Sequence, residues 1–341
     1  MSDFAVFKTT LASAAPKLFD LLDRFDLAKI LVIGDLTLDE FLTGQVERLS
    51  REAPVLILRH EETQQIPGGG GNAIYNFAKL GAKVTAIGLT GKDPQGEALR
   101  QIFTEAGIDS DNIVIDPSRP TVTKTRIAGH ARQSVTQQIV RVDRKSDRLP
   151  TPEIQAQLAE AIHNRLKTFD AVVFSDYGEG VLTPPVIKAG LSHSRVIVDA
   201  QKDLQRYQQA TLFTPNLPEA EKAVGYGINE SNLTEAGRDL LNLTQAEAIL
   251  ITRGEDGMTL CDRNLTLQHI PAFNRTDVFD VTGAGDTVVA ALTLALCVGS
   301  SFWEAAVLGN LAASLVVRQF GTATTSVEEM KIALTNLLEE V

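Results

Sequence analysis

Short apolar runs alternate with helical patterns along most of this chain, and this alternation limits the folds open to it. The apolar runs cover 29–34, 84–89, 171–175, 196–199, 211–214 and 248–252. The helical patterns cover 72–80, 94–106, 152–168, 184–192, 217–224 and 235–243. A continuous apolar run is typical of a strand covered on both faces. The alternation therefore predicts βαβ units, and with them an α/β fold with a parallel-sheet core and helices on both faces.

Two stretches interrupt the alternation. Residues 41–66 contain short strand patterns and no helix, and residues 122–143 read as a long hairpin with a turn around Gly129. Both predict a small antiparallel β layer on the edge of the main sheet. Such a layer would form a lid over a site at the strand ends; a surface excursion without function is the alternative.

The domain organisation follows from these patterns. Residues 1–28 are predicted to form an N-terminal helical extension, because Phe19, Leu22 and Phe25 recur at helical spacing within 17–27. One α/β domain then covers 29–341, with lid segments at about 41–66 and 120–143. Its tail is predicted to form short strands over 257–270 and three helices from Gly283 onward.

Composition restricts the partners. The formal net charge is −11, which argues against nucleic acid and acidic membranes, because both require a basic surface. The longest apolar run, 288–298, is shorter than the roughly 20 residues of a membrane-spanning helix. Only two cysteines occur, and residues 1–28 contain no signal-peptide pattern. We therefore expect a cytoplasmic protein.

The segment Asp280 to Asp286, Asp-Val-Thr-Gly-Ala-Gly-Asp, precedes an apolar helix. Gly283, Ala284 and Gly285 permit a tight turn whose N–H groups, with the helix dipole, would bind an anion such as a nucleotide phosphate. Asp286 at the same helix start could accept the proton of an incoming hydroxyl as a phosphoryl group transfers. The alternative is a glycine turn with Asp286 as a capping residue.

Two further groups could bind a small polar ligand. The segment 67–72, Pro-Gly-Gly-Gly-Gly-Asn, opens a helix; Gly69 and Gly70 allow close backbone approach, and Asn72 offers a donor and an acceptor. Asp35 and Asp39 follow the first strand, where carboxylates could accept hydrogen bonds from a polyol. A flexible turn and solvated loop carboxylates are the respective alternatives.

These motifs together resemble those of the ribokinase-like (PfkB) carbohydrate kinases, from about residue 29 to about residue 324. Asp280 to Asp286 is similar to the second family signature, and Pro67 to Asn72 with its helix is similar to the first. Asn216-Leu217-Pro218-Glu219 resembles the family's Asn-x-x-Glu motif, and Thr252-Arg253-Gly254 resembles a strand-end segment that contacts nucleotide phosphate.

The resemblance implies an ATP-dependent sugar or sugar-phosphate kinase that uses Mg²⁺. Asn216 and Glu219 would position Mg²⁺ through water, Asn310 and Ala313 would lie near adenine, and Asp35, Asp39, Gly69, Gly70 and Asn72 would hold the sugar. The resemblance also suggests a monovalent cation such as K⁺ at Asp280 and Thr282, for which turn stabilisation is the alternative. Relatives often dimerise through the lid, which implies a homodimer.

Within the family, the likeness is greatest to the kinase half of the bacterial heptose enzymes, which phosphorylate D-glycero-D-manno-heptose 7-phosphate at O1. Shared stretches include 48–55 and Ser175-Asp176-Tyr177-Gly178. Lys124, Arg126 and Arg141 on the predicted hairpin would grip the substrate phosphate, or else be solvated edge charges. Tyr177 itself is predicted to be a packing residue.

Three departures from the heptose-kinase pattern fall where the substrate would be selected. The family's Asp-Pro-Lys-Gly appears here as Asp199-Ala200-Gln201-Lys202, Arg51 replaces a proline, and the hairpin turn at 129–136 is longer. The adenylyltransferase half of the bifunctional heptose proteins does not follow before Val341. A kinase of a free sugar or nucleoside, and a non-catalytic sugar or nucleotide sensor, are the competing functions.

Overall fold

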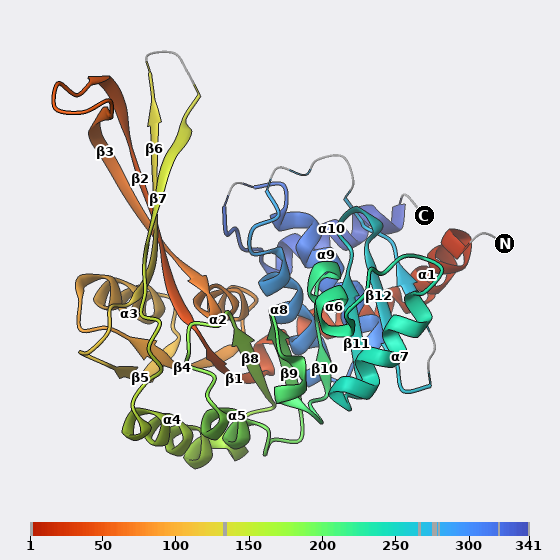
Figure 1. The fold of residues 1–341 in the computed structure, drawn as a ribbon. Helices are drawn as coiled ribbons and strands as arrows, with labels where there is room; N and C mark the ends of the chain where they lie inside the picture. The colour runs from red at the N-terminus through yellow and green to blue at the C-terminus, as the bar shows by residue number, and fades with distance from the viewer. Residues whose placement is uncertain are drawn as a thin grey trace.

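A nine-stranded sheet forms the centre of the computed structural model, which describes residues 3–131, 135–264, 267–274, 278, 280–319 and 321–339. The strand order is β13-β12-β11-β10-β9-β8-β1-β4-β5 (Figure 1). All pairings from β5 to β11 are parallel, and β12 and β13 add an antiparallel edge. The strands are β1 (Lys29–Gly34), β4 (Lys83–Thr90), β5 (Asp109–Ile115), β8 (Ala171–Asp176), β9 (Val196–Ala200), β10 (Leu212–Phe213), β11 (Ala248–Thr252), β12 (Met258–Asp262) and β13 (Leu267–Ile270).

Helices cover both faces of this sheet, as predicted. One face carries α1 (Asp3–Asp23), α2 (Gly70–Lys79), α3 (Pro94–Glu105), α8 (Ala284–Cys297), α9 (Phe302–Val316) and α10 (Val327–Glu339). The other carries α4 (Pro152–Arg165), α5 (Pro184–Gly190), α6 (Leu217–Val224) and α7 (Leu233–Thr244). Short 3₁₀ turns are η1 (Phe25–Leu27), η2 (Leu166–Thr168), η3 (Leu204–Tyr207) and η4 (Gly254–Asp256).

The two hydrophobic cores explain why the strands read as continuous apolar runs. Along β1, Ile30 and Val32 pack into one core, whereas Leu31 and Ile33 pack into the other. Successive side chains of a strand point to opposite faces. A strand that is covered twice must therefore be apolar at every position.

The remaining four strands form a separate lid sheet, in the order β3-β2-β6-β7. This sheet is mixed and not antiparallel throughout as predicted, because its two antiparallel hairpins are joined by a parallel pairing of β2 with β6. It consists of β2 (Leu36–Leu49), β3 (Leu56–Gly69), β6 (Val122–His130) and β7 (Gln137–Arg144), and it projects from the body as a narrow sheet (Figure 1). β2 and β3 are longer than predicted: the lid starts one residue after β1 and runs directly into α2. The hairpin turn predicted to be longer includes residues 132–134, which lie outside the described residues.

Glu40 fixes the base of the lid. It is 7% exposed, and its carboxylate accepts hydrogen bonds from one residue of each other lid strand. The donors are Gln65 of β3 (2.8 Å), Thr125 of β6 (2.7 Å) and Arg144 of β7 (3.3 Å). Gln95 of α3 adds a longer contact of 3.5 Å to the same carboxylate. These contacts hold the four strands in register and join them to the body.

Other elements differ from the sequence predictions in extent. The N-terminal helix spans Asp3–Asp23, so it is longer than the predicted 17–27, and the chain from Phe25 on is the 3₁₀ turn η1. β10 contains only Leu212 and Phe213. β5 was not predicted, because its first residues, Asp-Ser-Asp-Asn, carry no strand pattern. Among the described residues, no helix is long and apolar enough to cross a membrane.

Candidate active site

Asp286 lies in the first turn of α8, where the sequence predicts the reactive carboxylate. Gly283 caps this helix with a left-handed backbone (φ +77°), and a Cβ at this position would lie 2.6 Å from Nδ2 of Asn72. Glycine is therefore required both for the turn and for the close packing against α2. The turn places Asp286 at 3% exposure, while the adjacent Gly285 has no atom within 4 Å of its Cβ position. The backbone at Gly285 is thus open to solvent beside a buried carboxylate.

The turn predicted to bind an anion differs from the prediction at one of its three N–H groups. The N–H of Ala284 donates to the carbonyl of Val281 at 3.2 Å. This bond closes the turn, so that N–H already has a partner, contrary to the prediction that all three residues hold phosphate. Gly283 and Gly285 keep the predicted position at the N-terminal end of α8.

Two side chains from different elements hold the Asp286 carboxylate. Asn72 of α2 donates to Oδ2 at 2.7 Å, and the Tyr177 hydroxyl donates to Oδ1 at 3.0 Å. The pKa of Asp286 is raised to about 6, because burial and then the charge of Asp39 raise it more than the two donors and Lys124 lower it. The carboxylate is therefore ionised at neutral pH and is near the pKa that suits a general base.

Asn72 is itself held by a second layer of buried amides and hydroxyls. Asn76, one turn further along α2, donates to the Asn72 backbone carbonyl (2.9 Å) and to its Oδ1 (3.2 Å). Thr287 of α8 donates to Oδ1 of Asn76 at 2.8 Å. Asn72, Asn76 and Thr287 are all at most 1% exposed. We call Asp286, Asn72, Asn76, Thr287 and Tyr177 the buried network.

Asp35 has a different place from the one predicted. Its side chain has no exposed surface, and its carboxylate accepts three backbone N–H groups, from Tyr177 (2.9 Å), Glu179 (3.0 Å) and Val181 (2.9 Å). Its pKa is raised to about 6, because burial and then the charge of Asp176 raise it more than the three backbone donors lower it. Asp35 therefore holds the loop after β8 in place, and the structure does not support its predicted contact with the sugar.

Asp39 closes the site from the lid. Its carboxylate is 2.7 Å from Nη1 of Arg126, whose guanidinium also lies 5.1 Å from the centre of the Phe41 ring. β2 and β6 pair in parallel with Asp39 opposite Lys124, so both point to the same face of the lid. Lys124 reaches toward the Tyr177 ring, at 5.9 Å from its centre. A Cβ on Gly68 of β3 would be 2.4 Å from Oδ2 of Asp39, so this glycine leaves room for the carboxylate.

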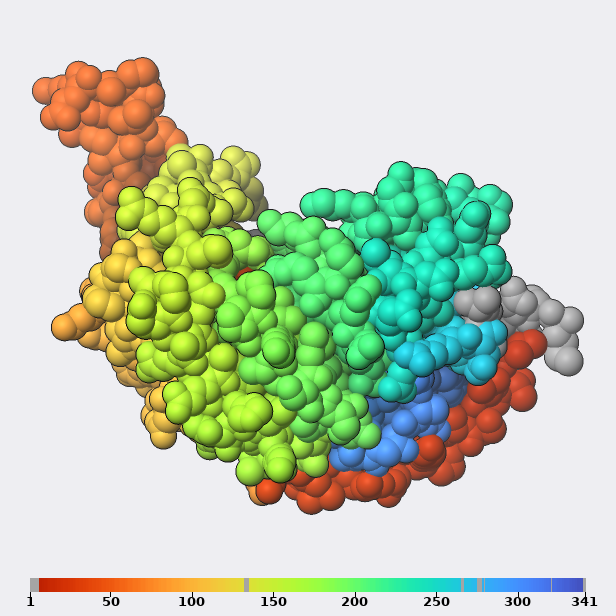
Figure 2. Space-filling model, turned by 60° about the horizontal axis from the view of Figure 1, so that its bottom comes forward, coloured from red at the N-terminus to blue at the C-terminus, as the bar shows by residue number. Residues whose placement is uncertain are grey.

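A cleft of about 180 Å³ adjoins Asp286. Its other wall is made by the strand ends and by the first turn of α6; the lining residues are Asp176, Tyr177, Asp199, Gln201, Thr214, Asn216, Glu219, Thr252, Gly283, Gly285 and Asp286. Figure 2 shows the surface hollowed between the lid and the α6–α7 segment. The cleft thus brings together the Asp280–Asp286 signature and the Asn-x-x-Glu segment, and the 67–72 signature reaches it through the hydrogen bond of Asn72 to Asp286.

Asn216 and Glu219 form a reciprocal cap at the start of α6. Oδ1 of Asn216 accepts the Glu219 N–H, and Oε2 of Glu219 accepts the Asn216 N–H, both at 2.9 Å. Asn216 also pairs with Thr252 in an isolated β-bridge. Burial raises the pKa of Glu219, while its hydrogen bonds with Asn216 and the charge of Lys222 lower it.

Asp199, at the end of β9, adds a further carboxylate to this wall. Burial first, then the charges of Asp286 and Glu219, raise its pKa well above the ordinary value. Among the described residues, no lysine or arginine nitrogen lies within 4.0 Å of Asp199, Glu219 or Asp286. The cleft therefore gathers several carboxyl groups, of which Asp176 is paired with Arg206 at 3.1 Å.

The remaining predicted residues lie around this cleft without lining it. Arg253 donates to Thr259 at 3.1 Å and pairs with Glu230, and Gly254 opens η4. Asn310 donates to the carbonyl of Pro271 at 2.7 Å, and Ala313 packs at the edge of one core.

The predicted cation site and the outer hairpin show contacts that favour the alternatives stated for them. Asp280 accepts the N–H groups of Thr282 (2.9 Å) and Gly321 (3.0 Å), so it stabilises the turn. Arg141 pairs with Asp143 at 2.8 Å and is 49% exposed, as an edge charge would be.

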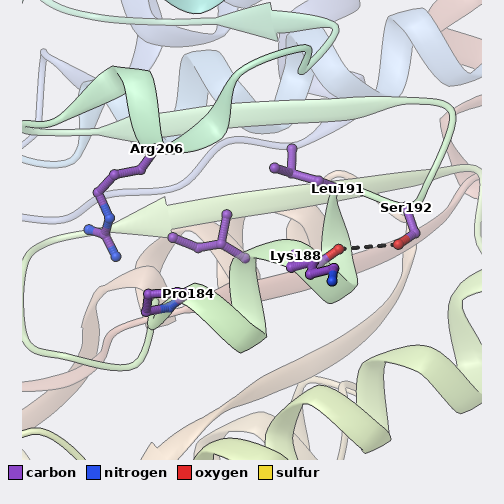
Figure 3. Close-up of a pocket in the computed structure, with 6 residues that line it drawn as sticks. Pro184, Lys188, Leu191, Ser192 and Arg206 are labelled. Atoms are coloured by element: carbon purple, nitrogen blue, oxygen red, sulfur yellow. Dashed lines mark hydrogen bonds between the residues drawn. The ribbon is translucent and has the colours of Figure 1, made fainter.

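A larger hollow lies away from these residues. It measures about 390 Å³ and is lined by Pro184, Ile187, Lys188, Leu191, Ser192 and Arg206. Figure 3 shows that the labelled side chains come from α5, the turn after it, and η3. Arg206 links this hollow to the cleft through an ion pair of 3.1 Å with Asp176.

Sequence reasoning missed two residues of the site. Tyr177 was predicted to pack, and Asp199 was noted only as the start of an altered motif. Asp199 carried a usable signal, since it ends a buried strand in the same way as Asp35 follows β1. The Tyr177 contact had none, because it joins residues 109 positions apart in the sequence.

Chemically, the arrangement can take a proton from a hydroxyl beside an anion-binding turn. The buried carboxylate supplies the base, and the lid supplies polar groups that could bind a polyol. The opposite wall supplies oxygen ligands of the kind that suit Mg²⁺.

Comparison with known proteins agrees with this arrangement. The family model described as pfkB family carbohydrate kinase matches residues 27–330. Among curated relatives, the bifunctional protein HldE of Pelobacter propionicus is 42% identical over 317 residues, which are 90% of this chain and 63% of that protein. HldE of Caulobacter vibrioides is 43% identical over 310 residues, 88% and 62% of the two chains. This chain thus spans less than two thirds of the length of these relatives.

Solved structures show the same fold. Ribokinase of Arabidopsis thaliana, complexed with ribose and ATP, aligns with a TM-score of 0.68 and 19% identity, over 92% of this chain and 99% of that one. Phosphofructokinase-2 from Escherichia coli, in complex with potassium, aligns with a TM-score of 0.72 and 20% identity, over 91% and 99%.

Proposed function

Because this chain belongs to the pfkB family of carbohydrate kinases, we propose that it transfers the γ-phosphoryl group of ATP to a hydroxyl of a sugar or sugar phosphate. The observation that carries the proposal is the placement of Asp286. It is a buried carboxylate with two fixed donors, at the N-terminal end of a helix and on the wall of a cleft. Phosphoryl transfer depends mainly on positioning and charge stabilisation, which such a site supplies.

In this mechanism Asp286 acts as general base. The acceptor hydroxyl gives its proton to the Asp286 carboxylate while its oxygen bonds to the γ-phosphorus. The bond between that phosphorus and the bridging oxygen breaks, and ADP leaves. The positive end of α8 and the open backbone at Gly285 support the negative charge on the transferring group.

The cleft also fits a divalent cation with its waters. Asp199, Glu219 and Asn216 offer hard oxygen ligands, and among the described residues no lysine or arginine nitrogen lies within 4.0 Å of the Asp199 or Glu219 carboxyl group. We assign Asn216 and Glu219 to Mg²⁺ through water, with Asp199 facing the same ion. When bound, Mg²⁺ would neutralise phosphate charge. A monovalent cation at Asp280 and Thr282 remains a prediction.

For the acceptor, we propose D-glycero-D-manno-heptose 7-phosphate, phosphorylated at O1. The stretches shared with the heptose kinases and the identity to HldE support this choice. Asp39, Asn72 and the backbone of Gly69 and Gly70 would hold the sugar. Lys124 is the lid cation best placed for a phosphate, and Lys202 also approaches the cleft, because a Cβ on Gly178 would lie 3.4 Å from its Nζ.

One observation favours an unphosphorylated sugar as the second candidate. Two of the three lid cations predicted to grip phosphate are already paired, Arg126 with Asp39 and Arg141 with Asp143. An acceptor without a phosphate would leave both pairs intact. This candidate keeps the same base and the same nucleotide site.

We further propose a cytoplasmic homodimer that forms through the lid. The lid exposes apolar side chains, which partner association would cover: Leu49, Val55, Leu56, Ile139, Val140 and Val142. Both cysteines are unpaired, as expected in a reducing compartment. Molecular mass in solution, measured by light scattering for the wild type and for Leu56→Glu, tests the dimer; equal masses would exclude this lid contact.

The test of the function is ADP release with Mg-ATP across a panel of acceptors. The panel contains heptose 7-phosphate, hexose phosphates, free hexoses, ribose and nucleosides, with Asp286→Asn as the control. We expect turnover with the heptose phosphate and its loss in the variant. Turnover on free sugars alone would favour the second candidate, and silence of the wild type on every acceptor would reject the kinase proposal.

A further inference from the structure

We infer that Tyr177 is a positioning residue for the general base: its hydroxyl orients the Asp286 carboxylate and keeps it ionised. The inference rests on the proposed function, since it assigns a role within that same site. Tyr177 follows β8, Asp286 lies on α8, and the hydroxyl is 3.0 Å from Oδ1. The two carboxylate oxygens thus have one fixed donor each, Tyr177 on Oδ1 and Asn72 on Oδ2.

The loop that carries Tyr177 is fixed at several points. The backbone N–H of Tyr177 donates to Oδ2 of Asp35, and the N–H groups of Glu179 and Val181 donate to the same carboxylate. Asp176 accepts the Gly178 N–H at 2.9 Å and the Tyr207 hydroxyl at 2.5 Å. A side chain on a loop held in this way can position its partner, because little motion is left in the backbone.

The phenol can act only as a donor here. Burial, and then the charges of Asp286 and Asp199, raise the pKa of Tyr177 well above its ordinary value of 10. The phenol therefore keeps its proton at neutral pH and can donate it in a hydrogen bond to the Asp286 carboxylate. A hydrogen bond to the ionised carboxylate stabilises that form.

The surroundings of Asp286 leave Tyr177 a distinct part to play. The titratable groups facing the carboxylate are Asp39 and Lys124 from the lid, Asp199 from β9, and Tyr177 itself. Asp39 and Asp199 oppose its ionisation, whereas Lys124 and the donors support it. Removing one donor should raise the pKa of Asp286 and loosen its orientation, without touching the cation or nucleotide ligands.

The test compares Tyr177→Phe with a matched tyrosine outside the site. The Tyr226 hydroxyl donates to Asp239 at 2.8 Å, so Tyr226→Phe removes the same type of bond elsewhere. We measure kcat, KM for both substrates, and the pH dependence of kcat/KM from pH 5 to 8.5, with the acceptor that the wild type uses.

For Tyr177→Phe we expect kcat to fall about tenfold, with both KM values within twofold of the wild type. We also expect the acidic limb of the pH dependence of kcat/KM to move to higher pH by about one unit. Tyr226→Phe should match the wild type. In an Asp286→Asn background, Tyr177→Phe should cause no further loss, because its effect acts through Asp286.

Other outcomes would overturn the inference. An unmoved acidic limb would show that Tyr177 does not support the base, and a raised acceptor KM with unchanged kcat would make it a substrate contact. If Tyr177→Phe does not fold, Tyr177→Gln replaces it, because glutamine keeps an N–H donor. We expect the acidic limb of the kcat/KM profile of this variant to lie closer to that of the wild type. A shift of this limb by as much as one pH unit would also contradict the inference. A wild type inactive on all acceptors would reject the proposed function and with it this role, whereas an active wild type with an unmoved limb in Tyr177→Phe would reject the role alone.

Discussion

The buried network and the lid meet beside Asp286 and Tyr177 but are built in opposite ways. In the buried network, Asp286, Asn72, Asn76 and Thr287 are at most 3% exposed, and each has a fixed hydrogen-bond partner. In the lid, every residue of β7 is exposed, and the buried carboxylate of Glu40 joins the four strands at the end nearest the body. The general base, Asp286, is therefore aligned before substrate binds. Many polar groups of the lid, by contrast, are still available to a ligand.

This difference follows from what each part must do. Packing and hydrogen bonds hold the reacting groups in place, which reduces the reorganisation needed in the transition state. A substrate-selecting surface gains from polar groups that remain free to bind. The following experiments test whether chemistry and selection really divide between these two regions.

The largest effect is expected from the buried network. Asp286→Asn keeps the shape but removes the base, so kcat should fall about 10²- to 10⁴-fold while both KM values stay within a few-fold. ADP release at saturating substrate measures this. A variant that retained full turnover would show that the chemistry does not depend on this carboxylate.

A lid variant should act on binding instead. Arg126→Ala leaves Asp39, 4% exposed, without its partner at 2.7 Å, and we expect kcat/KM for the acceptor to fall about 10- to 100-fold through KM. Arg59→Ala, in the same lid but 61% exposed and paired with Glu47 at 3.6 Å, is the control and should change neither constant. A fall confined to kcat would show that Arg126 acts in the chemical step, as the buried network does. It would contradict the division of chemistry and substrate selection between the two regions.

Stability gives an independent comparison. The folded-state pKa of Asp286, about 6, lies above the unfolded value of 3.8, so the stability that its protonated form contributes is complete below pH 3.8 and is lost as the pH rises through 6. Asp286→Asn avoids that loss, and it should raise the free energy of unfolding by about 1–3 kcal/mol at pH 8. The difference should shrink toward pH 4. Melting temperatures across this range measure it, and an equal difference at pH 4 and 8 would contradict the assignment.

The smallest effect is expected at Arg141. It is half exposed and paired with Asp143, and exposed ion pairs contribute about 0–1 kcal/mol. Arg141→Ala should therefore change acceptor KM less than about threefold and leave the melting temperature unchanged. If KM for a phosphorylated acceptor rose tenfold or more while that for a free sugar did not, Arg141 would be a phosphate ligand after all.

The sequence predicted the main sheet well because its strands are covered on both faces. Continuous apolar runs marked β1, β4, β8, β9 and β11, whereas β5 was missed because it begins with polar residues. The lengths of the lid strands β2 and β3 were underestimated because they, like the start of β5, contain many polar residues. Much of β3 is solvent-exposed, so burial does not impose an apolar pattern on its residues.

The candidate site was predictable where glycine and acidic residues form local motifs. The turn before α8 and the start of α2 carry such signals, and the structure brings them together through Asn72 and Asp286. The role of Asp35 could not be derived in this way, because its partners are backbone groups more than 140 positions away. The local sequence around an aspartate does not distinguish a ligand for sugar from a support for a loop.

The connections of the lid have a mechanical consequence. Asp35 alone separates β1 from β2, and β3 passes into α2 without a linker, so these two lid strands join the body beside the catalytic groups. A tilt of the lid would therefore strain the first turn of α2, where Asn72 holds Asp286. A movement of the lid on acceptor binding would then also move Asn72 and change the alignment of Asp286. A force applied to the tip of the lid would likewise displace the carboxylate that faces the acceptor hydroxyl.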